Sequence, residues 1–369
     1  MPSGSLKSEV REFNLSSSLA TESKLNPTTV GVIGCGYWGP NLLRNFSENE
    51  DARLSWMCDL DRKRLEALGR RYPSAKITTD YHQLLADPEL DAIVIATPVS
   101  THFNFAKDAL RAGKHVLIEK PFTANVAEAE ELIEIAERER LILMVDHTFI
   151  YTGAVRKVKE MLESGELGEL LYFDSVRINL GLFQRDINVV WDLAPHDLAI
   201  MDYIIDRQPL SVAATGSCHV ERGIENIAYV MLRFPDEFIA HFHFNWLSPV
   251  KIRRTLIAGS RKMIVYDDIE PTEKIRVYDK GVMITRTEDA ANKEEAYRTL
   301  VSYRTGDVWV PKLDSTEALR YVCDEFLSAI VERRQPLTNG HSGLRVVRLL
   351  EAAQQSISQG GRMIELSSM

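Results

Sequence analysis

The chain has 369 residues, of which 45% are apolar and 26% are charged. This length predicts two or three domains, and the composition excludes a wholly disordered or fibrous chain. The net charge of −9 disfavours nucleic acid as a bulk electrostatic partner, although a local basic pocket for one phosphate group stays compatible with it. No apolar run approaches a membrane span and the first residues lack the apolar middle of a secretory signal, so we expect a cytoplasmic protein without a membrane partner.

The first half of the chain alternates predicted strands and helices. Residues 1–28 are rich in Ser, Thr, Lys and Glu and are expected to form a mobile extension. From residue 29 to 149, helical patterns separate short β-branched or apolar runs: VGVIG (30–34), LSWMCD (54–59), AIVIAT (92–97), HVLIEK (115–120) and LILMVDH (141–147). Strand, helix and strand in regular succession predict right-handed crossovers and a doubly wound parallel sheet covered on both faces.

The pattern changes in residues 150–369. A helix at 151–165, a strand at 169–180 and a helix at 191–205 precede five predicted strands: 224–234, 237–246, 251–260, 261–268 and 274–280. The short gaps between them predict a large, open and mainly antiparallel sheet with one face on helices, which makes this an α+β domain. Two helices, at 315–334 and 342–360, end the chain. The last of them could pack back onto the first domain, and the fold class as a whole is α/β.

A glycine motif follows the first predicted strand. Gly34, Gly36 and Gly39 form G-x-G-x-x-G between that strand and a helix. In this context Gly34 makes the tight turn, Gly36 lets the backbone approach a pyrophosphate, and Gly39 permits close packing of the helix, whose N-terminus faces the anion. Glycines can also mark a purely structural turn, but the position of the motif favours a dinucleotide site.

A carboxylate ends the second strand. Asp59 stands 23 residues beyond Gly36, where a carboxylate would bind the adenosine ribose hydroxyls and repel a 2′-phosphate. NAD is therefore favoured as the cofactor. NADP stays open because Arg62, Lys63 and Arg64 follow closely, and one of them, Arg62 being our choice, could reach a phosphate, whereas a solvated first helical turn would explain the others.

Two further groups of residues suggest chemistry. Lys120 ends the fourth long strand and precedes Pro121, at the edge where open α/β sheets place their ligands. Asp192 and His196 lie four residues apart at the start of an apolar helical pattern, so a helix would put both on one face and let the carboxylate orient the imidazole. Asp192 could instead be an N-cap and His196 a core histidine, but an amino group and a dinucleotide site upstream favour catalysis.

Together these motifs resemble the Gfo/Idh/MocA family of NAD(P)-dependent oxidoreductases, which act on sugars, cyclitols and nucleotide sugars. The resemblance runs from about residue 29 to the C-terminus and includes PLTNGHSG at 336–343. It implies a Rossmann domain followed by a domain whose open sheet often forms homodimers or homotetramers. It also implies that cofactor contacts extend beyond the glycines and Asp59 to Tyr37, Trp38, Ala96, Thr97, Pro98, His102, Glu119 and Lys120.

The family roles transfer to three catalytic candidates. The resemblance implies that His196 is the general base on the sugar hydroxyl, since an imidazole titrates near working pH. Lys120 would bind the same oxygen and stabilise its developing negative charge, and Asp192 would hold the substrate or tune His196. This scheme needs no metal. A His-x-His pair, His241 and His243, could bind zinc, but no third ligand is evident in the sequence; this strand fits an interface better.

Several polar residues are candidates for the substrate site. His147 and Tyr151 stand at the entrance of the second domain. A stretch between a strand and the catalytic helix carries groups suited to a sugar carboxylate or a diphosphate, namely Arg177, Asn179, Gln184 and Arg185.

The sequence therefore predicts an oxidoreductase acting on a ring hydroxyl or keto group, such as that at C3, of a nucleotide sugar. The resemblance to members of surface-polysaccharide and sugar-antibiotic pathways favours that substrate, and a free-sugar or inositol dehydrogenase is the alternative. Two other classes stay open: a dinucleotide sensor without turnover, against which Lys120 and His196 count, and a glycosidase that uses bound NAD transiently.

Overall fold

The computed structural model describes residues 26–181, 183, 187–284 and 301–366. The predicted tail therefore lies outside the described residues up to residue 25, and Thr28 already begins the first strand. No helix of the described chain is both long and apolar enough to cross a membrane.

The first domain contains a six-stranded parallel sheet in the order β3-β2-β1-β4-β5-β6. Its strands are β1 (Thr28–Ile33), β2 (Ala52–Cys58), β3 (Lys76–Thr78), β4 (Ala92–Ile95), β5 (His115–Glu119) and β6 (Leu143–Asp146). The connecting helices are α1 (Gly39–Glu48), α2 (Arg62–Arg71), α3 (His82–Leu85), α4 (Val99–Arg111) and α5 (Val126–Glu139). The central strands are buried throughout, as expected for a parallel sheet with helices on both faces. The predicted doubly wound domain is confirmed.

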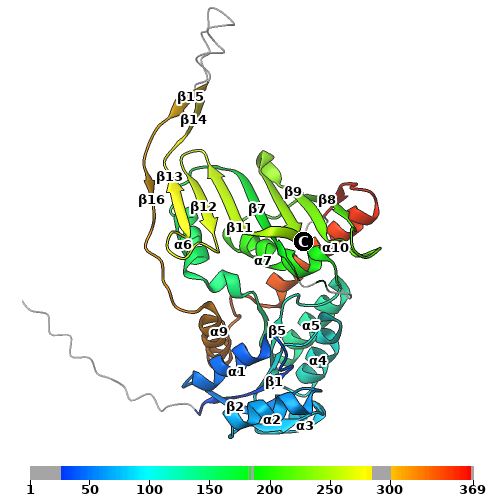
Figure 1. The fold of residues 1–369 in the computed structure, drawn as a ribbon. Coiled ribbons are helices and arrows are strands. Elements are labelled where there is room, and N and C mark those ends of the chain that lie inside the picture. The colour runs from blue at the N-terminus through cyan, green and yellow to red at the C-terminus, as the bar shows by residue number, and fades with distance from the viewer. Residues whose placement is uncertain (1–25, 182, 184–186, 285–300, 367–369) are drawn as a thin grey trace, which may run out of the picture.

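The second domain contains a nine-stranded sheet in the order β16-β13-β12-β11-β7-β10-β9-β8-β17. Its strands are β7 (Leu170–Leu180), β8 (Ser211–Ser217), β9 (Ile227–Arg233), β10 (Ile239–Asn245), β11 (Leu247–Gly259), β12 (Met263–Asp267), β13 (Ile275–Tyr278), β16 (Val308–Trp309) and β17 (Ile364–Glu365). All neighbours are antiparallel except β7 and β10, so the predicted mainly antiparallel sheet is confirmed. A separate hairpin, β14 (Gly281–Ile284) and β15 (Val301–Arg304), projects from it (Figure 1).

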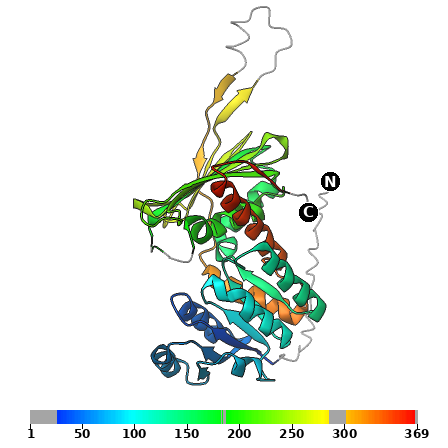
Figure 2. The ribbon, with the colours of Figure 1, turned by 90° about the vertical axis from the view of Figure 1, so that its right-hand side faces the viewer.

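Helices cover one face of this sheet. They are α6 (Gly153–Glu163), α7 (Val189–Ile204) and α10 (Gly340–Ser358), and a short turn, η2 (Pro235–Glu237), joins β9 to β10. The remaining two helices, η1 (Thr148–Tyr151) and α9 (Ala318–Glu332), pack against each other, and α9 lies beside the first domain. Helices α7 and α10 lie between the sheet and the first domain (Figure 2). The alternation of β10 explains this, because Phe242 and Phe244 are fully buried toward the helices and the intervening histidines face the other side.

The last two helices join the domains. Helix α10 packs against α5 of the first domain and α7 of the second, and α9 packs against α1. Phe46 of α1 meets Phe326 of α9 edge to edge at a centroid distance of 6.5 Å. The two domains therefore share one continuous apolar core that contains residues of both, which fixes the walls of the cleft between them.

Candidate active site

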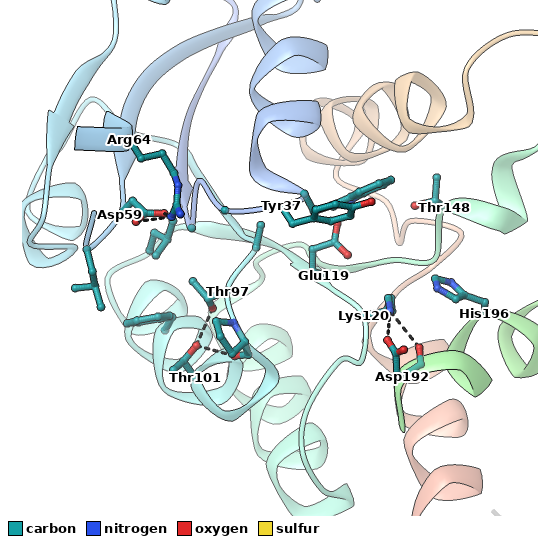
Figure 3. A pocket seen from close by; sticks show the side chains of 18 of the residues that line it. Tyr37, Asp59, Arg64, Thr97, Thr101, Glu119, Lys120, Thr148, Asp192 and His196 are labelled. Atoms are coloured by element: carbon teal, nitrogen blue, oxygen red, sulfur yellow. Dashed lines mark hydrogen bonds and ion pairs between the residues drawn. The ribbon is translucent and has the colours of Figure 1, made fainter. Parts of the chain in front are cut away.

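A cavity of about 1190 Å³ lies at the carboxyl ends of the strands of the first domain and continues to the second domain. This is where open α/β sheets bind their ligands. Its volume exceeds the roughly 300–1,000 Å³ typical of a single small-molecule site, so it has room for a cofactor and a substrate. Figure 3 shows its two ends, with Asp59 and Arg64 at one and Lys120, Asp192 and His196 at the other.

The glycine turn forms the floor of the first end. Gly34 has a φ of +92°, and a Cβ there would lie 2.4 Å from the Ala96 carbonyl oxygen. A Cβ on Gly39 would lie 2.3 Å from the Gly34 oxygen, so these two glycines allow the tight turn and the close start of α1. A Cβ on Gly36 would meet nothing within 4 Å, and this residue faces the cavity. Trp38 gives α1 no side-chain cap, which leaves its first N–H groups suited to an anion.

Asp59 holds the end of β2 in place. Its Oδ2 accepts a hydrogen bond from the Cys35 backbone N–H at 2.7 Å, and Arg64 donates to both carboxylate oxygens at 3.1 Å. Arg64 lines the cavity. Arg62, which the sequence favoured, instead lies 78% exposed and pairs with Glu66, because the first turn of α2 points it to solvent. The residue of the basic trio that reaches the cofactor end is thus Arg64.

The loop after β4 contributes Ala96, Thr97 and Pro98 to the cavity wall. His102 is fully buried behind them and is not a lining residue, contrary to the expected cofactor contact. Its ring nitrogens lie 2.8 Å from the Thr97 carbonyl oxygen and 2.9 Å from that of Pro121. His102 therefore ties the loop after β4 to the loop that carries Lys120.

Lys120 reaches across to α7. Its Nζ donates to the Asp192 backbone oxygen at 3.2 Å and lies 3.5 Å from Oδ1 of the same residue. Trp246 Nε1 donates to Asp192 Oδ2 at 3.1 Å. The N-cap of α7 is Asn188, whose side chain accepts two backbone N–H bonds, so the alternative of Asp192 as N-cap is wrong. These contacts bind Asp192 to the lysine and hold the ammonium group in the cavity.

His196 lies one helical turn beyond Asp192 and also faces the cavity. Its ring meets Phe149 edge to face at 4.9 Å. Burial lowers the pKa of His196 well below its ordinary value, and the positive charges of Lys120, Arg177 and Arg253 add to this. The imidazole is therefore neutral near pH 7 and can accept a proton.

Tyr37, Trp38 and Glu119 also line the cavity, and Figure 3 shows Tyr37 and Glu119 between its two ends. Burial and the neighbouring Asp146 carboxyl raise the pKa of Glu119 well above its ordinary value. The folded protein therefore favours the protonated form of Glu119, which lies next to the Asp146 carboxyl.

His147 and Tyr151 are not cavity residues in this structure, contrary to expectation. His147 is 3% exposed and Tyr151 is 1% exposed, because the turn after β6 folds both beneath the site. The Tyr151 hydroxyl lies 3.1 Å from Thr338 Oγ1. Burial lowers the pKa of His147 to about 4, so its ring is neutral.

The predicted anion-binding stretch divides into three parts. Asn179 lines the cavity. Arg177 is 3% exposed and gives its guanidinium to Asp197, so it is not a cavity residue. Gln184 and Arg185 lie outside the described residues. A residue that the sequence did not single out, Arg253 of β11, lines the cavity instead; only its place in the register of two neighbouring strands could have revealed it.

No group of three or more His, Cys, Asp or Glu side chains is placed to hold a metal ion within residues 26–181, 183, 187–284 and 301–366. His241 and His243 lie on the face of the sheet opposite the helices, where His241 pairs with Asp174 at 2.9 Å. Tyr229 stacks on His243 with a centroid distance of 4.4 Å.

Comparison with known proteins gives matches to both domains. Residues 28–147 match the oxidoreductase family with an NAD-binding Rossmann fold, and residues 155–265 match the GFO/IDH/MocA C-terminal domain. The chain is 24% identical to myo-inositol 2-dehydrogenase from Thermotoga maritima, over 89% of this chain and 96% of that protein. It is 28% identical to dTDP-3,4-didehydro-2,6-dideoxy-alpha-D-glucose 3-reductase from Saccharopolyspora spinosa, over 70% and 81% of the two chains.

A solved structure shares the same architecture. UDP-N-acetylglucosamine 3-dehydrogenase GnnA from Acidithiobacillus ferrooxidans superposes with a TM-score of 0.75 at 24% identity, and the match covers 91% of this chain and 99% of that one. At this level of identity the similarity shows the fold.

Proposed function

Because the chain belongs to the Gfo/Idh/MocA family of oxidoreductases and its first domain is an NAD-binding Rossmann fold, we propose that it transfers a hydride between NAD and a ring hydroxyl or keto group of a sugar. One observation carries the proposal: Lys120 and a neutral His196 lie at one end of the cavity whose other end is the glycine turn and Asp59. A proton acceptor and a cationic hydrogen-bond donor thus lie where the nicotinamide ring of a bound dinucleotide would be.

The first domain fits NAD by its shape and charge. The open space at Gly36 and the uncapped start of α1 would take the pyrophosphate. Asp59 would bind the adenosine ribose, and its carboxylate disfavours the 2′-phosphate of NADP. Arg64 is already bound to Asp59 and lies 3.8 Å from Asp61, so two carboxylates offset its charge, which also favours NAD.

The cofactor, when bound, supplies the hydride acceptor or donor. During oxidation, His196 takes the hydroxyl proton, and its neutral state in the folded protein leaves it ready to do so. Lys120 donates a hydrogen bond to the same oxygen and stabilises the negative charge that develops there. Asp192 positions the Lys120 ammonium group through its backbone oxygen and carboxylate.

We propose a nucleotide sugar as the substrate, oxidised or reduced at a position such as C3. Two similar proteins act on a nucleotide sugar at that position by their names, and the cavity exceeds the volume of one small ligand. A free sugar or inositol is the alternative, since a myo-inositol 2-dehydrogenase is also similar. A sensor would bind NAD without turnover, and an NAD-using glycosidase would show no net NADH formation.

The test is the change in nicotinamide absorbance with a panel of UDP-, dTDP- and GDP-sugars, free sugars and inositol. Lys120→Ala and His196→Ala should each lower kcat by about 10²- to 10⁴-fold while the affinity for NAD, measured by calorimetry, stays unchanged. Lys107→Ala is the matched control, because Lys107 pairs with Glu131 away from the cavity. Unchanged turnover in both active-site variants would refute the catalytic assignment.

We also propose that the face of the nine-stranded sheet opposite the helices joins copies of this chain into a homodimer or homotetramer. It exposes Tyr172, Tyr229 and Ile239 by 37%, 43% and 43%, and exposed apolar surface favours association. Light scattering on the wild type and on Tyr229→Glu tests this. A monomeric wild type would refute it.

A further inference from the structure

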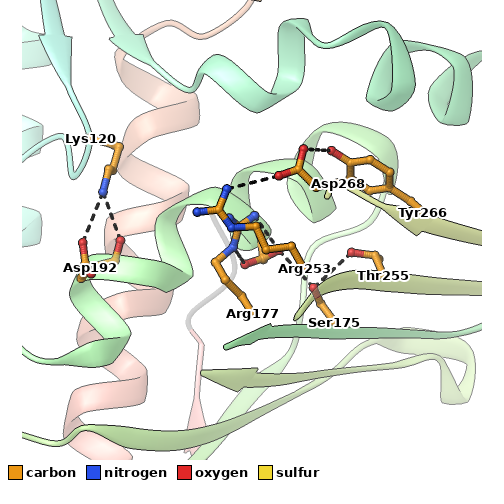
Figure 4. A network of polar contacts seen from close by, with 9 residues as sticks. Lys120, Ser175, Arg177, Asp192, Arg253, Thr255, Tyr266 and Asp268 are labelled. Carbon is orange, nitrogen blue, oxygen red and sulfur yellow. Dashed lines mark hydrogen bonds and ion pairs between the residues drawn. The ribbon is translucent and has the colours of Figure 1, made fainter. Parts of the chain in front are cut away.

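Two arginines lie side by side in the second domain, one of them lining the cavity and the other buried next to it. Arg253 of β11 pairs in register with Arg177 of β7, so both side chains leave the sheet on the same face. Arg177 donates to Asp197, and Arg253 Nη1 donates to Asp268 Oδ2 at 3.2 Å. Figure 4 shows the two guanidinium groups next to each other.

The two arginines differ in the number of hydrogen bonds that each guanidinium makes and in its exposure. Arg177 makes two hydrogen bonds to Asp197, and its side chain is 3% exposed. Arg253 has a side-chain exposure of 29% and lines the cavity. Its Nε is buried without a hydrogen-bond partner among the described residues. Arg253 is therefore the guanidinium that a ligand in the cavity can reach.

The charge of Arg253 is only partly compensated. Asp268 also lies 3.9 Å from Lys274 and accepts a hydrogen bond from the Tyr266 hydroxyl at 3.2 Å, so one carboxylate serves two cations. The positive charge of Arg253 acts on the catalytic end of the cavity, since it contributes to the lowered pKa of His196. An anion placed beside Arg253 would complete the charge balance of this end of the cavity.

We propose that Arg253 binds an anionic group of the substrate, a carboxylate on the sugar or a phosphate linked to it. This inference rests on the proposed function for the identity of the ligand as a sugar. A guanidinium held at one nitrogen by Asp268 has donors left over in the same plane, and that planar fork matches the oxygens of a carboxylate or a phosphate. The reacting hydroxyl is assigned to Lys120 and His196 and not to Arg253, so Arg253 should stabilise the bound substrate and the transition state alike.

The matched control is the next residue of the same strand. Arg254 points to the opposite face of the sheet, pairs with Asp267 at 2.7 Å and is 48% exposed. Arg253→Met and Arg254→Met thus each remove one arginine–aspartate pair, but only the first removes a cationic cavity residue. Arg253→Lys keeps the charge and loses the planar fork.

The experiment measures binding to the protein–NADH complex by calorimetry, so that it does not depend on turnover. The probes are glucose, glucuronate, UDP-glucose and UDP-glucuronate. We expect the wild type to bind the anionic probes more tightly than glucose. Arg253→Met should weaken that binding by about 10- to 100-fold, Arg253→Lys should weaken it less, and Arg254→Met should leave it unchanged.

The pattern of losses identifies the anion. Loss of the preference for glucuronate over glucose assigns Arg253 to a sugar carboxylate, and loss of the preference for UDP-glucose over glucose assigns it to a phosphate. The inference is overturned if the wild type binds the anionic probes no more tightly than glucose. It is also overturned if Arg253→Met and Arg254→Met change the binding constants of the anionic probes to the same extent. Absence of NADH formation with every sugar would contradict the proposed function separately, because these binding constants would still report on Arg253.

Discussion

The substitution His147→Leu tests how a buried imidazole beneath the site sets the response of the protein to acid. His147 is 3% exposed, and neither ring nitrogen has a hydrogen-bond partner within the described chain. Burial, followed by the positive charges of Lys120 and Arg345, lowers the pKa of His147 from 6.5 to about 4. This side chain therefore stays neutral in the folded protein over a pH range in which it is protonated in the unfolded chain.

The sign and size of the effect follow from that difference. As pH falls through 6.5, the unfolded chain takes up a proton on His147, whereas the folded protein does so only near pH 4. The unfolded state binds more protons in this window, so the free energy of unfolding falls with pH. At about 1.4 kcal/mol per pKa unit, His147 alone accounts for a loss of about 2 kcal/mol between pH 8 and pH 5, and about 3 kcal/mol by pH 4.

Urea denaturation of the wild type and His147→Leu across this pH range measures the effect. At pH 8 the two proteins should have similar stability, because leucine removes two buried nitrogens that make no hydrogen bond. At pH 5 the variant should have lost about 2 kcal/mol less than the wild type. Equal losses in the two proteins would refute the reasoning. A rise of tenfold or more in the substrate KM of the variant would indicate that His147 contacts the substrate, as expected from the sequence.

Two predictions concern the cofactor end. Gly36→Ala should leave the free energy of unfolding within about 0.5 kcal/mol of the wild type, because a Cβ there meets nothing within 4 Å. It should weaken NAD binding by more than about tenfold in calorimetry, and an unchanged affinity would contradict the close approach of a pyrophosphate. Asp59→Ala should lower the ratio of NAD to NADP affinity by about tenfold or more, measured by titration with both cofactors. An unchanged ratio would show that another group reads the ribose.

The parts of the site that the sequence predicted are those set by local spacing. Gly34, Gly36 and Asp59 belong to one strand–turn–helix–strand unit, and their positions relative to one another follow from the geometry of that unit. Lys120 at a strand end and His196 on a helix were predictable in the same way. The order of strands likewise predicted both sheets, because strands joined by helical crossovers pair in parallel and strands joined by short turns pair antiparallel.

The rest depended on partners distant in sequence. Nothing near Arg177 in the sequence indicates that Asp197 will occupy its guanidinium, or that Arg253, from a strand more than 70 residues later, will face the cavity in its place. The burial of His102 and His147 is likewise decided by the loops and helices that cover them. The parallel pairing of β7 with β10 inside an antiparallel sheet was also invisible to a reading of consecutive strands.

The outer edge of the first sheet depends on a segment far along the chain. Strand β6 ends the parallel sheet, and its Val145 N–H donates to the Thr338 carbonyl oxygen at 2.8 Å while Thr338 Oγ1 donates to the Val145 oxygen at 2.7 Å. A ribosome must therefore add almost 200 residues after β6 before that edge is paired. Until then the strand presents open backbone groups, which are a template for association between chains. During synthesis the first domain thus passes through an interval in which the β6 edge of its sheet has no backbone partner. We expect the yield of folded protein in a cell to depend on how well association between chains is prevented during that interval.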